Sequence, residues 1–146
     1  MITALHHIGI SVADLDRSIA FYRDLLGMSL SSQHPFGGAR FEQILRLEGA
    51  AGRAAHLHGG GTEVELFEFA HPRPQTAAPD RPVNAHGITH FCVEVADLRG
   101  LHATMSEAGV DFHCPPIDFD ICEATYCRDP DGNVIELIQM YDRPDP

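Results

Sequence analysis

The sequence repeats one pattern, and this repeat restricts the folds that the chain can adopt. Residues 7–15 (HIGISVADL) match residues 90–98 (HFCVEVADL), since both read His, alternating residues and then Val-Ala-Asp-Leu. A second match pairs residues 61–69 (GTEVELFEF) with residues 132–140 (GNVIELIQM), so that Glu65 falls on Glu136. Two copies of one supersecondary unit should share a topology, so the repeat predicts a duplicated architecture.

Each copy has the pattern of a strand, a helix and three further strands. Alternation predicts a strand at the start of each copy, and helical spacing of apolar residues then predicts a helix that ends at Gly27 or Gly109. Further strands are expected at 28–33, 52–58 and around Glu65 in the first copy, and at 111–113, 122–128 and around Glu136 in the second. Residues 43–47 fit a short helix. These elements predict an α+β fold class.

The two copies are expected to form a single domain that spans residues 1–146. Its length fits one domain, and residues 71–86 contain four prolines without a periodic apolar pattern, which is typical of a linker. We therefore expect module 1 at residues 1–70, a linker at 71–86 and module 2 at 87–146.

The charge balance argues against several partners. The chain has 21 acidic and 10 basic residues, all of the latter Arg, and a formal net charge of -11. Such a surface is a poor partner for nucleic acid or an anionic membrane. The sequence begins without a basic leader, and no apolar run approaches about 18 residues, so we expect a cytoplasmic protein. The four cysteines lack CxxC spacing and are expected to be free thiols.

The repeat places two imidazoles and two carboxylates at equivalent positions. Successive side chains of a strand point to opposite faces, so His7 and His90 lie on the mixed polar faces of their strands. The last strand of each copy adds one carboxylate, Glu65 or Glu136, to the same face. We expect the four side chains to converge on one divalent ion (Zn, Ni, Co, Mn or Fe), because two facing carboxylates without a cation would repel each other.

Nearby residues leave alternatives open. His6 aligns with Thr89 and is expected to point to the opposite face, away from the metal. His56 and His58 share one face of a central strand; they either shape the cavity or hydrogen-bond the substrate, or they are ordinary exposed or packed polar positions. Glu63 shares a face with Glu65 and replaces it if the register differs by two residues, although the repeat favours Glu65.

The sequence resembles the vicinal oxygen chelate superfamily, which includes glyoxalase I, methylmalonyl-CoA epimerase, extradiol dioxygenases and drug-resistance proteins. The resemblance implies two βαβββ modules that form a U-shaped mixed sheet around a metal site, and a homodimer. It also implies metal ligands at His7, Glu65, His90 and Glu136. The matching segments are spread over essentially the whole chain: residues 7–12, 18–27, 64–68, 87–90 and 129–137.

The order of these ligands is similar to that of bacterial glyoxalase I. Methylmalonyl-CoA epimerases commonly have Gln at the position of Glu65, and extradiol dioxygenases use only the positions of His7, His90 and Glu136. The resemblance therefore implies a metal-dependent lyase or isomerase whose small-molecule substrate has adjacent oxygens. In this hypothesis Glu65 or Glu136 is the catalytic base that removes a proton, and the ion stabilises the enolate. The alternatives are an Fe(II) ring-cleaving dioxygenase and a non-catalytic protein that sequesters a small molecule.

Overall fold

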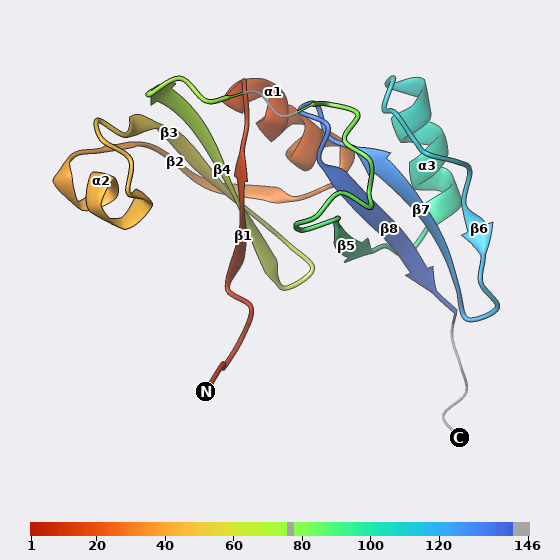
Figure 1. The fold of residues 1–146 in the computed structure, drawn as a ribbon. Coiled ribbons are helices and arrows are strands. Elements are labelled where there is room, and N and C mark those ends of the chain that lie inside the picture. Colours follow the sequence, from red (N-terminus) through yellow and green to blue (C-terminus); the bar gives the residue numbers. More distant parts are fainter. Residues whose placement is uncertain (76–77, 142–146) are drawn as a thin grey trace. The chain divides into compact units, whose positions relative to one another are not determined.

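The computed structural model describes residues 1–75 and 78–141, and the chain divides into two compact units, Met1–Ala77 and Ala78–Pro146. The first unit contains one four-stranded sheet in the order β1-β4-β3-β2 (Figure 1). Strands β1 and β4 are parallel, whereas the other neighbours are antiparallel. The elements of this unit are β1 (His7–Ser11), α1 (Leu15–Ala20), η1 (Phe21–Leu25), β2 (Ser29–Gly37), α2 (Ala39–Leu45), β3 (Ala51–Gly59) and β4 (Thr62–His71).

The second unit contains a sheet with the same kind of topology, in the order β5-β8-β7-β6. Again the first two strands in that order are parallel and the other pairs are antiparallel. Its elements are β5 (Phe91–Glu94), α3 (Leu98–Glu107), β6 (Ile117–Asp118), β7 (Cys122–Arg128) and β8 (Val134–Met140). Two mixed sheets with few helices confirm the predicted α+β class.

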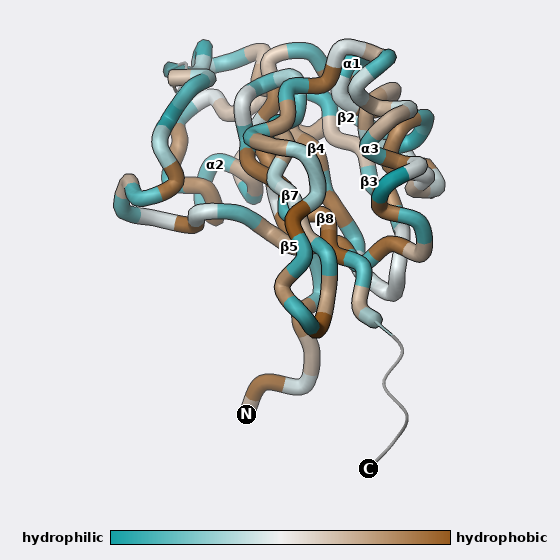
Figure 2. The backbone as a smooth tube through the Cα atoms, turned by 90° about the vertical axis from the view of Figure 1, so that its right-hand side faces the viewer, coloured by the Kyte–Doolittle hydropathy of each residue, from teal (hydrophilic) through white to brown (hydrophobic). Residues whose placement is uncertain are grey.

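One face of each sheet is apolar and forms the core of its unit. In the first unit α1 packs on β3 and β4, and Leu15, Leu57 and Leu66 are fully buried. In the second unit α3 packs on β8, where Leu98 and Leu137 are fully buried. Burial of one such side chain stabilises a fold by about 1.5–3 kcal/mol. Teal and brown alternate over short distances along the strands in Figure 2, as expected when the opposite face is polar.

The repeat also determines how both first helices begin. Asp14 caps α1 by accepting a hydrogen bond from the backbone N–H of Arg17 at 3.0 Å, and Asp97 caps α3 through the N–H of Gly100 at 2.9 Å. These are the Asp residues of the repeated Val-Ala-Asp-Leu. Such caps satisfy backbone donors that the helix itself leaves unpaired.

A residue of the last strand supplies a second cap in each unit. Glu68 Oε2 accepts a hydrogen bond from the N–H of Leu15 at 2.7 Å, and Gln139 Oε1 accepts one from the N–H of Leu98 at 2.8 Å. Glu68 and Gln139 occupy matching positions of the repeat. The strand that carries the candidate metal ligand, Glu65 or Glu136, therefore also fixes the start of the helix that packs against it.

Two tight turns set the register of the final hairpins. Gly60 and Gly61 have φ values of 57° and 77°, and they connect β3 to β4 directly after the Gly59–Thr62 pair. Positive φ at both central residues is the geometry that suits a two-residue hairpin. In the second unit, Asp129 accepts hydrogen bonds from the backbone N–H groups of Asp131 and Asn133, both at 2.9 Å, and stabilises the turn before β8.

Some expected elements lie elsewhere. The prediction of a strand at 111–113 is wrong, because Phe112 forms only an isolated bridge there, with Cys127. The edge strand of this sheet is β6 instead. Pro115 and Pro116 lie just before β6 and lack the N–H groups that a ladder needs, so pairing resumes only after them. The short helix expected at 43–47 begins earlier, at Ala39. In the part of the chain that the structure describes, no helix is long and apolar enough to cross a membrane.

Candidate metal centre

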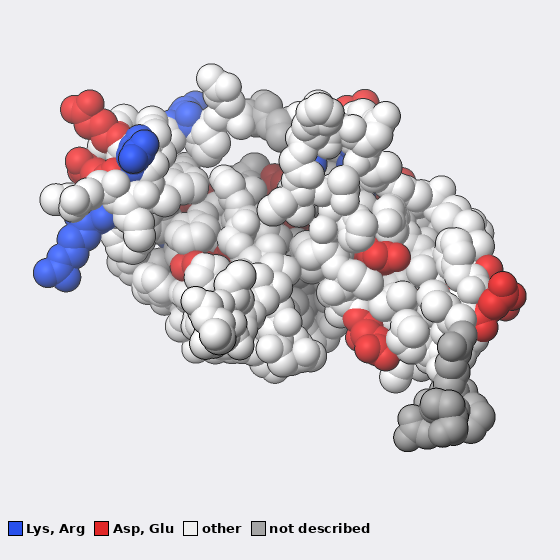
Figure 3. Space-filling view, turned by 60° about the horizontal axis from the view of Figure 1, so that its bottom comes forward, with Lys and Arg blue, Asp and Glu red and all other residues white. Residues whose placement is uncertain are grey.

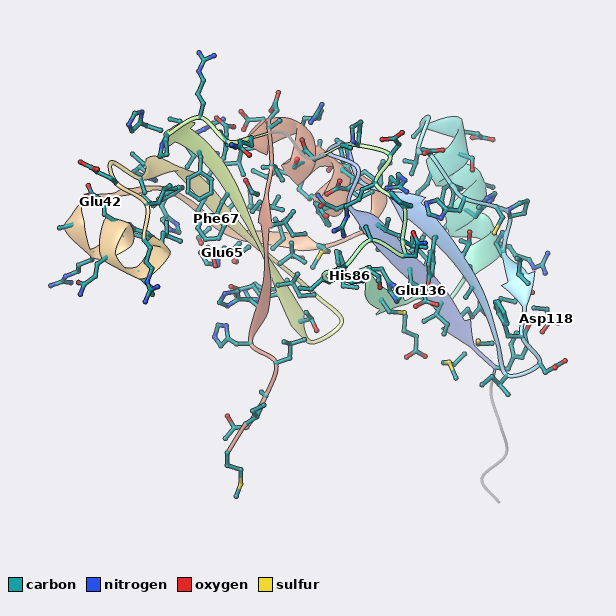
Figure 4. All side chains as sticks on the ribbon, in the orientation of Figure 1. Glu42, Glu65, Phe67, His86, Asp118 and Glu136 are labelled. Atoms are coloured by element: carbon teal, nitrogen blue, oxygen red, sulfur yellow. The ribbon has the colours of Figure 1, made fainter. Side chains whose placement is uncertain are left out.

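The structure brings His7 and Glu65 together on the polar face of the first sheet. His7 opens β1, and Glu65 lies on the neighbouring strand β4, opposite Gly9. The Nε2 atom of His7 lies 3.3 Å from Oε2 of Glu65. Figure 4 shows Glu65 and Phe67 beside each other along β4, as expected of residues two positions apart in a strand. The ring of His7 thus contacts Glu65, although the strand register places His7 opposite Glu63, and the choice of Glu65 as the metal ligand stays a prediction.

The second unit contains the corresponding pair. His90 directly precedes β5, and Glu136 lies on β8 opposite Cys92, just as Glu65 lies opposite Gly9. The Nε2 atom of His90 lies 3.0 Å from Oε2 of Glu136. The same two atom types therefore meet at nearly the same distance in both units. The binding of one ion by both pairs stays a prediction.

Glu65 has a second imidazole beside it. His56 of β3 is its direct cross-strand partner, and His56 Nε2 lies 3.4 Å from Glu65 Oε1. The other ring nitrogen of His56, Nδ1, lies 2.7 Å from Oε1 of Glu63. His56 thus links the two carboxylates of β4, and both Glu65 oxygens have an imidazole neighbour.

Glu63 lies among several imidazoles. Besides His56, its Oε2 lies 3.1 Å from Nε2 of His58, which is its cross-strand partner. The hydrogen bond to His56 lowers the pKa of the Glu63 carboxyl, and the nearby charges of His56, His58 and His6 act in the same direction. Glu63 is therefore an anion at neutral pH, and His56 and His58 contact the carboxylates of β4.

Sequence reasoning missed the position of His6. Its Nδ1 lies 2.9 Å from Nδ1 of His7, and His6, His7 and Glu63 offer ligand atoms within 4.8 Å of one another. The prediction that His6 points away from this face assumed strand alternation, but β1 begins only at His7. His6 precedes the strand, so its side chain does not follow the alternation.

Besides His90, a phenol and a thiol lie near Glu136. Tyr126 of β7 is its cross-strand partner, and the Tyr126 ring lies 4.9 Å from that of His90, measured between centroids. Desolvation raises the pKa of the Cys92 thiol to about 12, and the charge of Glu136 and a hydrogen bond to it act in the same direction. Cys92 therefore remains a neutral thiol at pH 7, which argues against a nucleophilic role.

Each His–Glu pair has the chemistry of half a divalent-metal site. Imidazole nitrogen and carboxylate oxygen bind Zn and similar ions at about 2.0–2.2 Å, so two ligands at a right angle lie about 3 Å apart. The distances of 3.3 Å and 3.0 Å fit that separation. In Figure 3, red acidic atoms occur at several separate places, whereas blue basic atoms gather mainly at the end that holds α2. Such a charge distribution favours cations over anions as partners.

Comparison with known proteins identifies the family. The family model described as the Glyoxalase/Bleomycin resistance protein/Dioxygenase superfamily matches residues 4–137. The chain belongs to this superfamily. The resemblance noted from the repeated motifs is thereby confirmed.

Individual relatives of this superfamily member differ in their named activities. A probable lactoylglutathione lyase from Synechocystis is 28% identical over 143 residues, covering 97% of this chain and 98% of its own. The mitochondrial methylmalonyl-CoA epimerase of Mus musculus is 24% identical over 151 residues, covering 92% of this chain and 72% of the relative. A glyoxalase family protein from Bacillus cereus has a similar fold, with a TM-score of 0.90 at 20% identity and 97% of each chain covered. Lyases and epimerases thus both occur among the relatives, and at these identities they do not select one reaction.

Proposed function

We propose that the protein is a divalent-metal-dependent lyase or isomerase that removes a proton from a small substrate with two adjacent oxygens. The proposed metal ligands are His7, Glu65, His90 and Glu136. The observation that carries the proposal is the repeated contact between His Nε2 and Glu Oε2, at 3.3 Å in the first unit and 3.0 Å in the second. Two equivalent half-sites are what a duplicated module would supply to a single ion.

The donor set suits Zn, Ni, Co, Mn or Fe in the divalent state. Two neutral imidazoles and two carboxylates carry a total charge that cancels the 2+ of the ion, and four ligands leave up to two octahedral positions for substrate oxygens. When bound, the ion would polarise these oxygens and stabilise the negative charge that develops as the carbon loses its proton. His7 and His90 would hold the ion.

Glu136 is better suited than Glu65 to act as the catalytic base. Both oxygens of Glu65 have imidazole neighbours, His7 and His56, which hold the carboxylate in place. Among the residues that the structure describes, Glu136 contacts one imidazole, that of His90, and otherwise adjoins Cys92 and Tyr126. A carboxylate with fewer strong partners moves more easily from ligand to base. It would accept the carbon-bound proton and return it to another carbon or to the other face.

Hydrogen exchange tests this proposal even while the product is unidentified. The metal-free protein is reloaded with each of the five ions and mixed in D2O with a panel of hydroxy-carbonyl, thiohemiacetal and acyl-CoA substrates. We expect metal-dependent incorporation of deuterium at the carbon next to the carbonyl, measured by NMR. Glu136→Gln should slow the incorporation by about 10²- to 10⁴-fold, and Glu48→Gln, on the exposed surface, should not slow it. An absence of metal-dependent exchange or turnover across the panel would refute the proposal.

A second candidate is an Fe(II) dioxygenase that cleaves catecholic rings. It is favoured by a catechol-2,3-dioxygenase from Bacillus subtilis among the relatives, and it would need only His7, His90 and Glu136. Oxygen consumption with Fe(II) and catechols distinguishes the two hypotheses, because proton transfer proceeds equally well in anaerobic solution. A protein that takes up no divalent ion would instead favour sequestration of a small molecule.

The proposed enzyme is a cytoplasmic homodimer. This assembly follows from the superfamily resemblance, and the acidic balance argues against nucleic acid or membrane partners. Size-exclusion chromatography with light scattering checks the dimer through its expected mass of twice 16.0 kDa.

A further inference from the structure

Glu63 gives the first unit a carboxylate that the repeat does not require. It lies two residues before Glu65 on β4, and the matching residue of β8 is Val134, which is buried. Likewise His6 matches Thr89 and His58 matches Arg128 under the same pairing of strands. A pair of ligands for one shared ion explains His7 and Glu65, but it does not explain these additional groups.

The additional groups cluster around one point. In the sheet His7 is the direct neighbour of Glu63 on one side and His58 is its neighbour on the other. His6 reaches the same place from the segment before β1, with its Nδ1 at 2.9 Å from that of His7. Ligand atoms of His6, His7 and Glu63 all lie within 4.8 Å of one another. His6 and His7 are exposed, so small rotations of their rings can bring them to coordination distance.

Two further imidazoles hold the Glu63 carboxylate. His56 Nδ1 lies 2.7 Å from one oxygen and His58 Nε2 lies 3.1 Å from the other. Partners of this kind orient a carboxylate ligand in metal sites and restrict its rotation. Glu63 is therefore positioned in advance, whereas His6 and His7 supply the adjustable nitrogen donors.

We propose that His6, His7 and Glu63 form a second binding site for a divalent transition-metal ion, and that this ion competes with the first for His7. Two nitrogens and one carboxylate oxygen suit Zn, Ni or Cu better than Mg or Ca, which take oxygen ligands. The donors are exposed enough to exchange with solvent ions. Three protein ligands instead of four make this site the weaker of the two.

Competition follows from the chemistry of the imidazole. A neutral imidazole has one nitrogen with a free lone pair, so His7 can coordinate one ion at a time. The structure gives it two choices: Nε2 lies beside Glu65, and Nδ1 lies beside His6. An ion at the second site therefore removes His7 from the first, which keeps Glu65, His90 and Glu136. This inhibitory consequence rests on the proposed function, but the existence of the second site does not.

Metal stoichiometry tests the second site directly. Equilibrium dialysis of the whole protein against increasing Ni²⁺, followed by elemental analysis, should show two bound ions per chain at saturation. His6→Ala and Glu63→Gln should each bind one. The matched controls His86→Ala and Glu48→Gln remove an exposed imidazole and an exposed carboxylate elsewhere, and they should bind two. Two ions in His6→Ala, or one in the wild-type protein, would overturn the proposal.

A combined variant separates the failure of this inference from that of the proposed function. Glu65→Gln/His90→Ala/Glu136→Gln removes the first site and leaves His6, His7 and Glu63 intact. It should still bind one Ni²⁺ and lose it when His6→Ala is added, with folding checked by circular dichroism. If the variant folds and binds no ion while the wild-type protein binds one, the second site is wrong and the first stands. If the combined variant binds as much as the wild-type protein, the first site is wrong.

Inhibition provides a second readout once a substrate is found. Turnover of the wild-type protein should rise with the first equivalent of Ni²⁺ and fall at higher concentrations. His6→Ala should keep the rise and lose the fall, whereas His86→Ala should behave as the wild-type protein does. An identical fall in His6→Ala would show that excess ion inhibits elsewhere.

Discussion

The two units place the same pair of ligands in different surroundings. In the first unit the carboxylate of Glu65 adjoins the imidazoles of His7 and His56, and His56 continues to Glu63. In the second unit Glu136 adjoins His90, and its other neighbours are a thiol and a phenol. Duplication preserved the ligand pair, while the flanking positions of β3 and β7 diverged. The shared part suits metal binding, and the divergent part suits a division of roles between the carboxylates.

The largest expected effect comes from removing the charge of each carboxylate in turn. Glu136→Gln should lower kcat by about 10²- to 10⁴-fold with little loss of metal, because general-base catalysis contributes a factor of this size. Glu65→Gln should chiefly weaken metal affinity, because its partners hold it as a ligand. Steady-state kinetics at saturating ion, together with chelator competition, separates the two effects. Equal losses of kcat in both variants would contradict the division of roles.

The contact between the His and the Glu of each copy is predictable because both residues belong to the repeat, whereas their role as metal ligands stays a prediction. The helices and the hairpin turns are predictable for a similar reason, since Gly60, Gly61 and the segment around Asp129 carry recognisable turn chemistry. The cross-strand neighbours of the pairs were not predicted. The sequence does contain a signal for these neighbours. If the hairpin turn is taken to be Gly60–Gly61, the register of the two strands pairs His58 with Glu63 and His56 with Glu65.

Other contacts depend on tertiary packing and leave little trace in the sequence. Glu68 looks like a solvated residue in the strand pattern, but it caps α1 and forms an ion pair with Arg53 at 2.7 Å. His6 lies outside the strand whose alternation was used to orient it. Residues 111–113 do not form the expected strand, because pairing there is limited to an isolated bridge between Phe112 and Cys127. For Glu68 the deciding partners, Leu15 and Arg53, are distant in sequence, so the strand pattern alone does not reveal these contacts.

The surroundings of Glu136 predict that the neighbouring Cys92 thiol reacts slowly with alkylating agents. Because its pKa is raised from an ordinary value of 9.0 to about 12, Cys92 stays protonated until the pH approaches 12, and the thiolate is the reactive form. At pH 8 in metal-free protein, alkylation by iodoacetamide should therefore be about 10³-fold slower than for an ordinary cysteine. Peptide mass spectrometry over a pH series measures the rate at this residue.

Removing the charge of Glu136 should accelerate the alkylation of Cys92 by iodoacetamide. Glu136→Gln removes the negative charge that raises the pKa of Cys92 and replaces the charged hydrogen-bond acceptor with a neutral amide oxygen. Glu94→Gln, a smaller electrostatic contributor, provides the matched control and should change the rate less. A rate in Glu136→Gln equal to that of the wild-type protein would show that desolvation alone protects the thiol.

The smallest expected effect concerns the caps that the two last strands supply. Glu68→Ala and Gln139→Ala each remove the side-chain acceptor of one helix N-terminus, at Leu15 and Leu98, and such losses cost about 0.5–2 kcal/mol. Glu68→Ala should lie nearer the upper end, because it also breaks the ion pair with Arg53. Urea unfolding measures both free energies of unfolding. Arg53→Ala isolates the ion-pair part, which should be the smaller part because Arg53 is half exposed and solvent screens the pair. If the two variants lose the same free energy of unfolding, the two caps contribute equally despite their different charge. The divergence between the units would then be confined to the neighbours of the ligand pairs.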